Sequence, residues 1–261
     1  MVGQSRLLNN INAYTRENFP HSVLLLGEVG CGKHTLVNEI GTKFGFEVID
    51  ISKTISLDAI NEISGRAIPT IYIIDCSQIT ERHQNIILKF LEEPSSYAYV
   101  FLLAVNKSIL LPTIINRCVS FEFDPYSRET LSQFLKDDDL NVLDVCTTPG
   151  QVLSIHSGDL AKLRELCVTI ITKIGRANYP NTLSIVKKIN LKDEFDKFDI
   201  NVFFNVLLNT IFEVYRDGNV NDKSLELYNL VSSYKKRLRD TRLNKEYLLE
   251  NMLTSLWEFM R

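Results

Sequence analysis

The stretch that decides the fold is GEVGCGKHT, residues 27–35. It follows a short apolar run and opens a helical pattern, which is the setting in which a glycine-rich loop cradles phosphate groups. The pattern of such loops is G-x-x-x-x-G-K-[ST], in which the last residue supplies a hydroxyl that holds Mg²⁺. Here His34 occupies the hydroxyl position and Thr35 comes one residue late. We expect a nucleotide-binding loop rather than a plain glycine turn, formed by Gly27, Gly30, Gly32, Lys33, His34 and Thr35.

Apolar runs and helical patterns alternate on both sides of this loop. The runs do not alternate in polarity, as expected of strands that are buried on both faces of a parallel sheet. They lie at 22–27, 46–51, 70–75, 99–105 and 119–123. The helical patterns lie at 5–17, 33–44, 56–65 and 80–93. We therefore predict a doubly wound α/β domain with a five-stranded parallel sheet, whose ligands bind at the carboxyl ends of the strands.

After Asp124 the strand signal stops and only helical patterns follow. Two of them, at 127–138 and 160–175, flank the turn signal TTPGQ and predict a small helical domain. RANYPN (176–181) is the best candidate for a linker, and the remaining chain is helical again. In the apolar segment 200–215 a polar residue recurs every fourth position, which predicts a mostly buried helix and no membrane span. The predicted domains are 1–124, 125–176 and 177–261.

The composition is that of an ordinary soluble globular protein. Of 261 residues, 45% are hydrophobic and 23% charged, and the net charge is -3, so any contact with DNA must come from a local patch. The start lacks the basic and then apolar run of a signal peptide, so we expect a cytoplasmic protein. The five cysteines include no C-x-x-C pair, which favours reduced thiols over disulfides or a zinc site.

Two polar residues end predicted strands on the same edge of the sheet as the loop. Asp75 ends the third strand, where a carboxylate can hold Mg²⁺ and its waters, although a turn or capping Asp is the alternative. Asn106 follows the fourth strand, where it can orient a water or the terminal phosphate, and a turn Asn is equally compatible. Cys76 follows Asp75, where many ATPases place the glutamate that activates water, and a thiol cannot replace that base.

Arg117, in the tripeptide NRC (116–118), precedes the predicted fifth strand. From there an arginine cannot easily reach its own phosphate-binding loop. It could instead stabilise transferred charge in a neighbouring chain's site, as an arginine finger does. An ordinary surface arginine is the alternative.

In this order, the motifs resemble those of the AAA+ clamp-loader ATPases, and most closely the delta-prime type of the bacterial DNA polymerase III clamp loader. The LKFLEEP helix and NRC, the counterpart of the family's S-R-C motif, are the specific parts of the resemblance. It rests on VGQ (2–4), HSVLLLGEVGCGKHTL (21–36), IYIIDCSQIT (71–80), NIILKFLEEP (85–94), VNKSILLPTIINRC (105–118), PG (149–150) and NKEYLLENML (244–253).

The resemblance implies a three-domain subunit with an AAA+ base, a helical lid and a helical collar. It implies a hetero-pentamer with other clamp-loader subunits, in which the collars join the subunits and the bases surround primer-template DNA and open a sliding clamp. ATP would lie at subunit interfaces, and Arg117 would reach into the adjacent site.

Four departures from the family pattern indicate a subunit that holds ATP or ADP without hydrolysing it. His34 removes the Mg²⁺-binding hydroxyl, and Cys76 removes the water-activating carboxylate. Gly150 or Gln151 stands where motor subunits carry a sensor arginine, and no RP segment precedes VGQ. The interval between Lys33 and Asp75 is also too short for the family's four-cysteine zinc module, so no zinc is expected.

Two other readings of the same motifs are kept open. The chain could be an active motor subunit in which Thr35 or a water replaces the lost Mg²⁺ ligand. It could instead be a non-replicative AAA+ adaptor that scaffolds its partners.

Two charged clusters have ordinary explanations as well as functional ones. Glu92 and Glu93 end a predicted helix, where carboxylates oppose the helix dipole at a cost of about 0.3–1 kcal/mol each. A solvated helix end is the simpler reading, and basic groups of a neighbouring subunit are the alternative. The basic segment KKRLRDTRLNK (235–245) reads as an exposed face or a collar contact rather than a DNA site, because no aromatic residues interleave for base stacking.

Overall fold

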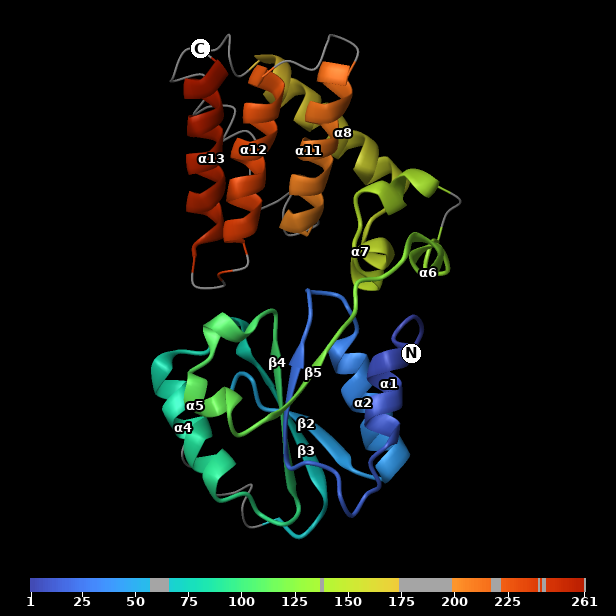
Figure 1. Ribbon diagram of the computed structural model, residues 1–261, viewed down its shortest axis with the longest axis vertical. Helices are drawn as coiled ribbons and strands as arrows, with labels where there is room; N and C mark the ends of the chain where they lie inside the picture. Colours follow the sequence, from blue (N-terminus) through green and yellow to red (C-terminus); the bar gives the residue numbers. More distant parts are fainter. Residues whose placement is uncertain are drawn as a thin grey trace. The chain divides into compact units, whose positions relative to one another are not determined.

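The computed structural model (Figure 1) describes residues 1–56, 66–136, 139–173, 199–216, 222–238, 240 and 243–260. The chain divides into two compact units, Met1–Thr130 and Leu131–Arg261. Most of the predicted helix 56–65 and the predicted linker 176–181 lie outside the described residues. The finer division of the second unit into lid and collar stays a prediction. Within the described residues, no helix combines the length and apolar character that a membrane crossing requires.

The first unit is built on a sheet of five parallel strands, as the apolar runs predicted. The strands are β1 (Ser22–Leu26), β2 (Glu47–Asp50), β3 (Thr70–Asp75), β4 (Ala98–Ala104) and β5 (Val119–Glu122). Their order is β2-β3-β4-β1-β5, so the loop that follows β1 leaves the sheet between β4 and β5. The residues of β1 and β4 are buried throughout, whereas the edge strand β2 has no buried residue and β5 has one.

Helices cover both faces of this sheet (Figure 1). Alternate residues of each strand point to opposite faces, so Val23 and Leu25 pack into one core and Leu24 and Leu26 into the other. The first core includes residues of α1 (Ser5–Asn12) and α2 (Lys33–Phe44). The second includes residues of α4 (Glu81–Glu92) and α5 (Pro112–Ile115). The doubly wound α/β architecture is therefore confirmed for this unit.

The first helix is shorter than its periodicity predicts. The helical pattern ran to residue 17, but α1 ends at Asn12. Beyond it, the backbone N–H of Thr15 donates to Oδ1 of Asn18 at 2.7 Å. A short polar side chain that captures a backbone donor in this way competes with the helix and ends it.

The second unit is helical wherever the structure describes it. Its elements are α6 (Arg128–Ser132), the 3-10 helix η3 (Leu140–Asp144), α7 (Pro149–Ser154), α8 (Ser157–Lys173), α11 (Ile200–Arg216), α12 (Asp222–Arg237) and α13 (Lys245–Met260). Helix α6 spans the boundary between the units and is much shorter than the predicted helix 127–138. Two turns replace the rest, because the N–H groups of Phe134 and Leu135 donate to carbonyls three residues earlier. No pattern in the sequence predicted η3.

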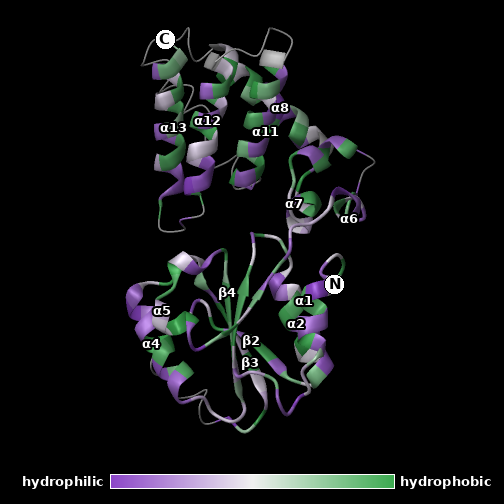
Figure 2. Cartoon of the chain, viewed as in Figure 1, coloured by the Kyte–Doolittle hydropathy of each residue, from purple (hydrophilic) through white to green (hydrophobic). Residues whose placement is uncertain are grey.

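Helix α11 forms the centre of the second unit. It packs against both α8 and α12, and Figure 2 shows that its residues are largely apolar. Phe203 and Phe204 are fully buried. The predicted polar stripe is present and has a partner, because Nδ2 of Asn205 donates to the carbonyl of Val145 at 2.5 Å. Asn209 likewise donates to the carbonyl of Asp144 at 3.1 Å.

Candidate functional site

The predicted phosphate-binding loop, residues 27–35, lies between the end of β1 and the first turn of α2, as the motif predicts. Gly30 and Gly32 have φ angles of 80° and 101°, a left-handed conformation that side chains with a Cβ rarely adopt. At Gly27 an added Cβ would lie 2.6 Å from the sulfur of Cys31, so only glycine fits there. The three glycines therefore let the backbone turn tightly and lead into the amino end of a helix, where anions bind.

The ammonium group of Lys33 lies against this loop. Its Nζ donates to the carbonyl oxygens of Gly27 at 2.6 Å and Glu28 at 2.9 Å. The side chain therefore folds back over the turn from the first residue of α2. A compact positive charge at this position can attract the terminal phosphates of a nucleotide.

Contacts from a distant part of the chain brace the loop. The hydroxyl of Tyr126 donates to the carbonyl of Cys31 at 2.7 Å. The fully buried side-chain amide of Gln4 accepts from the N–H and donates to the carbonyl of Asp124, both at 2.9 Å. The VGQ motif therefore ties the start of the chain to the segment after β5. Tyr126 had no sequence signal, because the contact joins residues 95 positions apart.

His34 and Thr35 are both exposed in the first turn of α2. The imidazole of His34 is close enough to Asp50, at the end of β2, to affect its carboxyl group. Burial alone would raise the pKa of Asp50, but hydrogen bonds from Ser52 and the nearby His34 outweigh it and lower that pKa. A histidine beside a carboxylate thus stands where phosphate-binding loops ordinarily present a hydroxyl.

Asp75 ends β3 and caps the 3-10 helix η1 (Cys76–Gln78). Its Oδ1 accepts from the N–H of Ser77 at 2.9 Å, while its own N–H donates to the hydroxyl of Ser52 at 2.8 Å. Ser52 in turn donates to Oδ1 of Asp50 at 2.5 Å. This polar chain joins the carboxyl ends of β2 and β3. The capping role that the sequence left open is therefore present, and a role in Mg²⁺ binding stays a prediction.

Cys76 points into the protein core and away from solvent. Its thiol is 1% exposed within the cluster between the sheet and α4, and it donates to the carbonyl of Ile74 at 3.6 Å. Burial raises its pKa far above the usual value, and the neighbouring Asp75 and Cys118 act in the same direction. The residue that follows Asp75 is therefore a protonated thiol at neutral pH, which cannot accept a proton from water.

Asn106 follows β4 and caps the 3-10 helix η2 (Lys107–Ile109). Its Oδ1 accepts from the N–H of Ser108 at 2.9 Å and also contacts the Ser108 hydroxyl. The turn role that the sequence allowed is therefore present. Because β1, β3 and β4 are parallel, Asn106, Asp75 and the phosphate-binding loop leave the sheet at the same edge.

Arg117 lies at the opposite edge, just before β5. The register pairs Val23 with Val119 and Leu26 with Glu122, so at least about 10 Å of sheet separates Arg117 from the loop that follows β1. Its Nη2 donates to Oε1 of Glu92 at 2.8 Å, and its Nη1 donates to the carbonyl of Thr113 at 3.0 Å. Glu92 is thus half exposed but paired within its own chain. The sequence had suggested a solvated helix end or a contact with a neighbouring subunit, and neither interpretation included this pair.

The remaining candidate positions lie in α7 of the second unit. Gln151 is 2% exposed. Its Oε1 accepts from the N–H of Thr147 at 2.8 Å, and its Nε2 donates to Oδ2 of Asp199 at 3.0 Å. Gln151 therefore anchors α7 to the start of α11.

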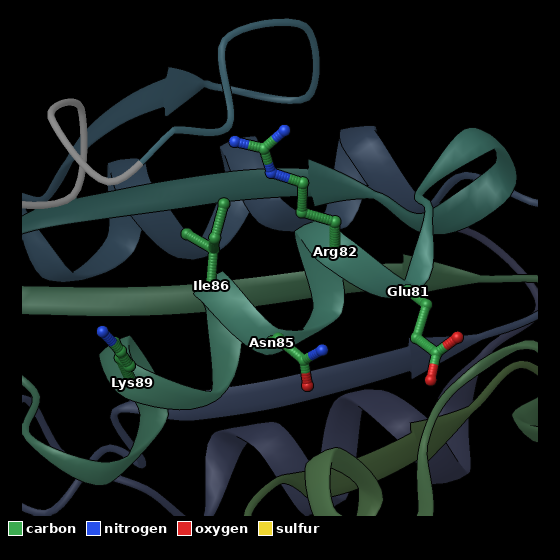
Figure 3. Close-up of a pocket in the computed structure, with 5 residues that line it drawn as sticks. All are labelled: Glu81, Arg82, Asn85, Ile86 and Lys89. Carbon is green, nitrogen blue, oxygen red and sulfur yellow. The ribbon is translucent and has the colours of Figure 1, made fainter.

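A pocket of about 460 Å³ lies on the outer face of α4 (Figure 3), and no residue of the predicted phosphate-binding loop lines it. It is lined by Glu81, Arg82, Asn85, Ile86 and Lys89. Both signs of charge are present, so the lining does not select a ligand by charge. In the part of the chain that the structure describes, no three His, Cys, Asp or Glu side chains are placed to share a metal ion.

Comparison with known proteins links this geometry to DNA polymerase III. Residues 47–127, from β2 to the segment after β5, match the family described as DNA polymerase III, delta subunit. DNA polymerase III subunit gamma of Buchnera aphidicola (subsp. Schizaphis graminum) is 25% identical over an alignment that covers 52% of this chain and 47% of that protein. Part of the chain is therefore similar to delta-type and gamma-type subunits of DNA polymerase III. The match spans about half the length of the curated relative.

Solved structures resemble this chain over nearly its whole length. A DNA polymerase III gamma subunit-related protein from Thermotoga maritima aligns with a TM-score of 0.56 and 19% identity, over 99% of this chain and 100% of that one. The RuvB Holliday junction branch migration motor from Thermotoga maritima aligns with a TM-score of 0.52 and 19% identity, over 95% and 88%. At such identities the likeness concerns the fold, which is similar to that of AAA+ proteins.

Proposed function

We propose that this chain is a delta-prime-like clamp-loader subunit that helps load a sliding clamp onto primed DNA during replication. The family match and the gamma-type relative both come from DNA polymerase III. In this proposal the chain works in a hetero-pentamer with ATP-hydrolysing subunits, and its phosphate-binding loop holds ATP or ADP without hydrolysing it.

The environment of its own nucleotide loop supports the absence of hydrolysis. Lys33 and the glycines are arranged to bind phosphates. His34 presents an imidazole in place of the hydroxyl that binds Mg²⁺, and Cys76 places a buried thiol after Asp75. Such a loop can retain a nucleotide but lacks the groups that position the metal ion and activate water.

The single observation that carries the stator role is the place of Arg117. It lies at the edge of the sheet opposite its own loop and is 38% exposed. An arginine there can act on a nucleotide only if that nucleotide belongs to another chain. We therefore propose that Arg117 stabilises the charge that develops on the phosphate in a neighbouring subunit's site.

The test of the replicative assignment is to tag the chain in its native cell, purify it gently and identify the proteins that accompany it by mass spectrometry. The proposal predicts recovery of other clamp-loader subunits together with clamp or polymerase. Recovery of the chain alone, or of unrelated proteins only, would favour the scaffold reading. A matched purification from the untagged strain separates specific partners from background.

A second candidate is an active motor subunit, and the gamma-type relative favours it. In that case Thr35, exposed beside His34, or a water would complete the Mg²⁺ site. The distinguishing result is ATP hydrolysis by the purified chain that disappears in Lys33→Ala.

A further inference from the structure

The guanidinium group of Arg117 is held by two partners from different elements. Glu92, the last residue of α4, accepts from Nη2 at 2.8 Å, and the carbonyl of Thr113 in α5 accepts from Nη1 at 3.0 Å. One bond to each terminal nitrogen fixes both the position and the plane of the group. Guanidinium has five N–H donors in a rigid fork, so three more are available for an incoming phosphate.

The two elements that carry this pair are themselves tied together. Gln84, on the buried face of α4, donates through Nε2 to the carbonyl of Ile109 at 3.0 Å. Its Oε1 accepts from the N–H of Leu111 at 2.7 Å. Both bonds join α4 to the residues just before α5. These bonds fix α4 relative to the residues that lead into α5, and the side chains of Glu92 and Arg117 lie at the surface of this frame.

The ion pair between Arg117 and Glu92 adds little to the stability of the fold. The two side chains are 38% and 50% exposed, and ion pairs this exposed contribute little because water screens them. A carboxylate at the carboxyl end of a helix is also disfavoured by the helix dipole, by a similar amount. The pair therefore leaves the fold no more stable than a neutral residue would. Its effect is to orient the arginine.

We infer that Glu92 is a positioning residue for Arg117, holding the guanidinium at the surface in the orientation in which it meets the neighbouring subunit's nucleotide. The inference rests on the proposed trans role of Arg117 and adds the residue that prepares it. Glu92 does not touch the nucleotide. Without its carboxylate, Arg117 keeps its charge and its bond to Thr113 but samples other rotamers, so fewer encounters are productive.

The experiment compares clamp-loader complexes that contain this chain as wild type, Glu92→Gln, Glu93→Gln or Arg117→Ala. Steady-state ATP turnover is measured with primed single-stranded DNA and sliding clamp. Losing the orienting carboxylate should lower kcat about threefold to tenfold at the one site that Arg117 serves, with KM for ATP unchanged. Total turnover should therefore fall by most of that site's share, and by no more than in Arg117→Ala. Glu93→Gln is the matched control. It removes the same charge at the next position along the chain, and the Glu93 side chain pairs with no described residue. Glu92→Asp should recover part of the loss.

A double variant separates positioning from a general effect on folding. If Glu92 acts only through Arg117, then Glu92→Gln combined with Arg117→Ala turns over ATP at the rate of Arg117→Ala alone. An additional loss of turnover in the double variant would overturn the inference. If Arg117→Ala lowers turnover but Glu92→Gln leaves it at the wild-type rate or raises it, the inference is also overturned. Normal turnover in Arg117→Ala would instead refute the proposed function itself, so the two failures are distinguishable.

Discussion

At the scale of single residues, the polar groups near the nucleotide loop are held by backbone partners. Asp75 and Asn106 each cap a short 3-10 helix, and Lys33 bonds to loop carbonyls. The sequence identified these residues from their places at strand ends. The contacts of Tyr126 and Glu92 were not predicted, because they depend on how distant segments meet in space.

Tyr72, in β3, offers a test of the core beside this site. Its hydroxyl is buried with no hydrogen-bond partner within the described residues, and its ring packs edge-on against Phe90. A buried hydroxyl without a partner costs about 1–3 kcal/mol. Tyr72→Phe should therefore raise the free energy of unfolding by about 1 kcal/mol, measured by urea denaturation. A loss of stability of that size would show that the hydroxyl has a partner.

Cys118, next to Arg117, gives a prediction that depends on pH. Burial raises the pKa of its thiol to about 11 from about 9, so at pH 8 the folded protein holds about a hundredth of the thiolate of the unfolded chain. Alkylation of Cys118 in the folded protein should be slow at pH 8 and rise about tenfold per pH unit as pH approaches 11. Peptide mapping after timed iodoacetamide treatment measures this rate. A rate at pH 8 equal to that in urea would contradict the burial.

The same pKa shift determines how the free energy of unfolding changes with pH. Because the folded-state pKa of Cys118 is raised, the folded state favours the neutral thiol. This contribution is fully present below about pH 9 and is lost as pH rises toward 11.

At the scale of elements, the sequence predicted the strands better than the short helices. Each predicted strand matches an observed one to within a residue at either end. For β1, β3 and β4 the reason is that a run apolar on both faces suits little besides a buried strand. The strands β2 and β5 were also expected to be buried on both faces, but they lie at the edges of the sheet and are more exposed. Helix α1 ended early and η3 went unseen, since their limits depend on local hydrogen bonds that periodicity does not report. The polar stripe of α11 was visible in the sequence, but its binding to the backbone of residues 144–145 was not.

This stripe provides the prediction for the second unit. Asn205 is 9% exposed and donates to the carbonyl of Val145 at 2.5 Å. Asn205→Ala leaves that carbonyl without this donor in a buried setting and should lower the free energy of unfolding by about 1–3 kcal/mol.

The matched control is Asn209→Ala, one helical turn away. Asn209 makes a longer bond at 3.1 Å to the carbonyl of Asp144 in a more exposed setting, where water can replace it. Its replacement should cost no more than about 0.5 kcal/mol. Chemical denaturation of the two variants measures the difference. Equal losses would contradict the structural importance given to the buried residue of the stripe.

At the scale of the whole molecule, the two edges of one sheet serve different chains in the proposed assembly. The carboxyl edge carries the phosphate-binding loop, and the opposite edge carries Arg117. The sequence predicted this separation, because the loop follows one predicted strand whereas Arg117 precedes another, and all the strands were expected to be parallel. It could not predict the pair with Glu92. A net charge of -3 offers no whole-chain attraction for DNA, so any contact with DNA must come from a local patch.

The most direct test places two changes in this chain within the assembled clamp loader and measures ATP turnover with primed DNA and clamp. Lys33→Ala removes the loop lysine, and Arg117→Ala removes the arginine at the other edge. We expect Lys33→Ala to leave ATP turnover within about twofold of wild type. Arg117→Ala should abolish the part of the total turnover that comes from the site Arg117 serves, because an arginine finger raises the rate at its site about a thousandfold or more. Loss of turnover in Lys33→Ala, with Arg117→Ala normal, would contradict it and identify an active motor subunit.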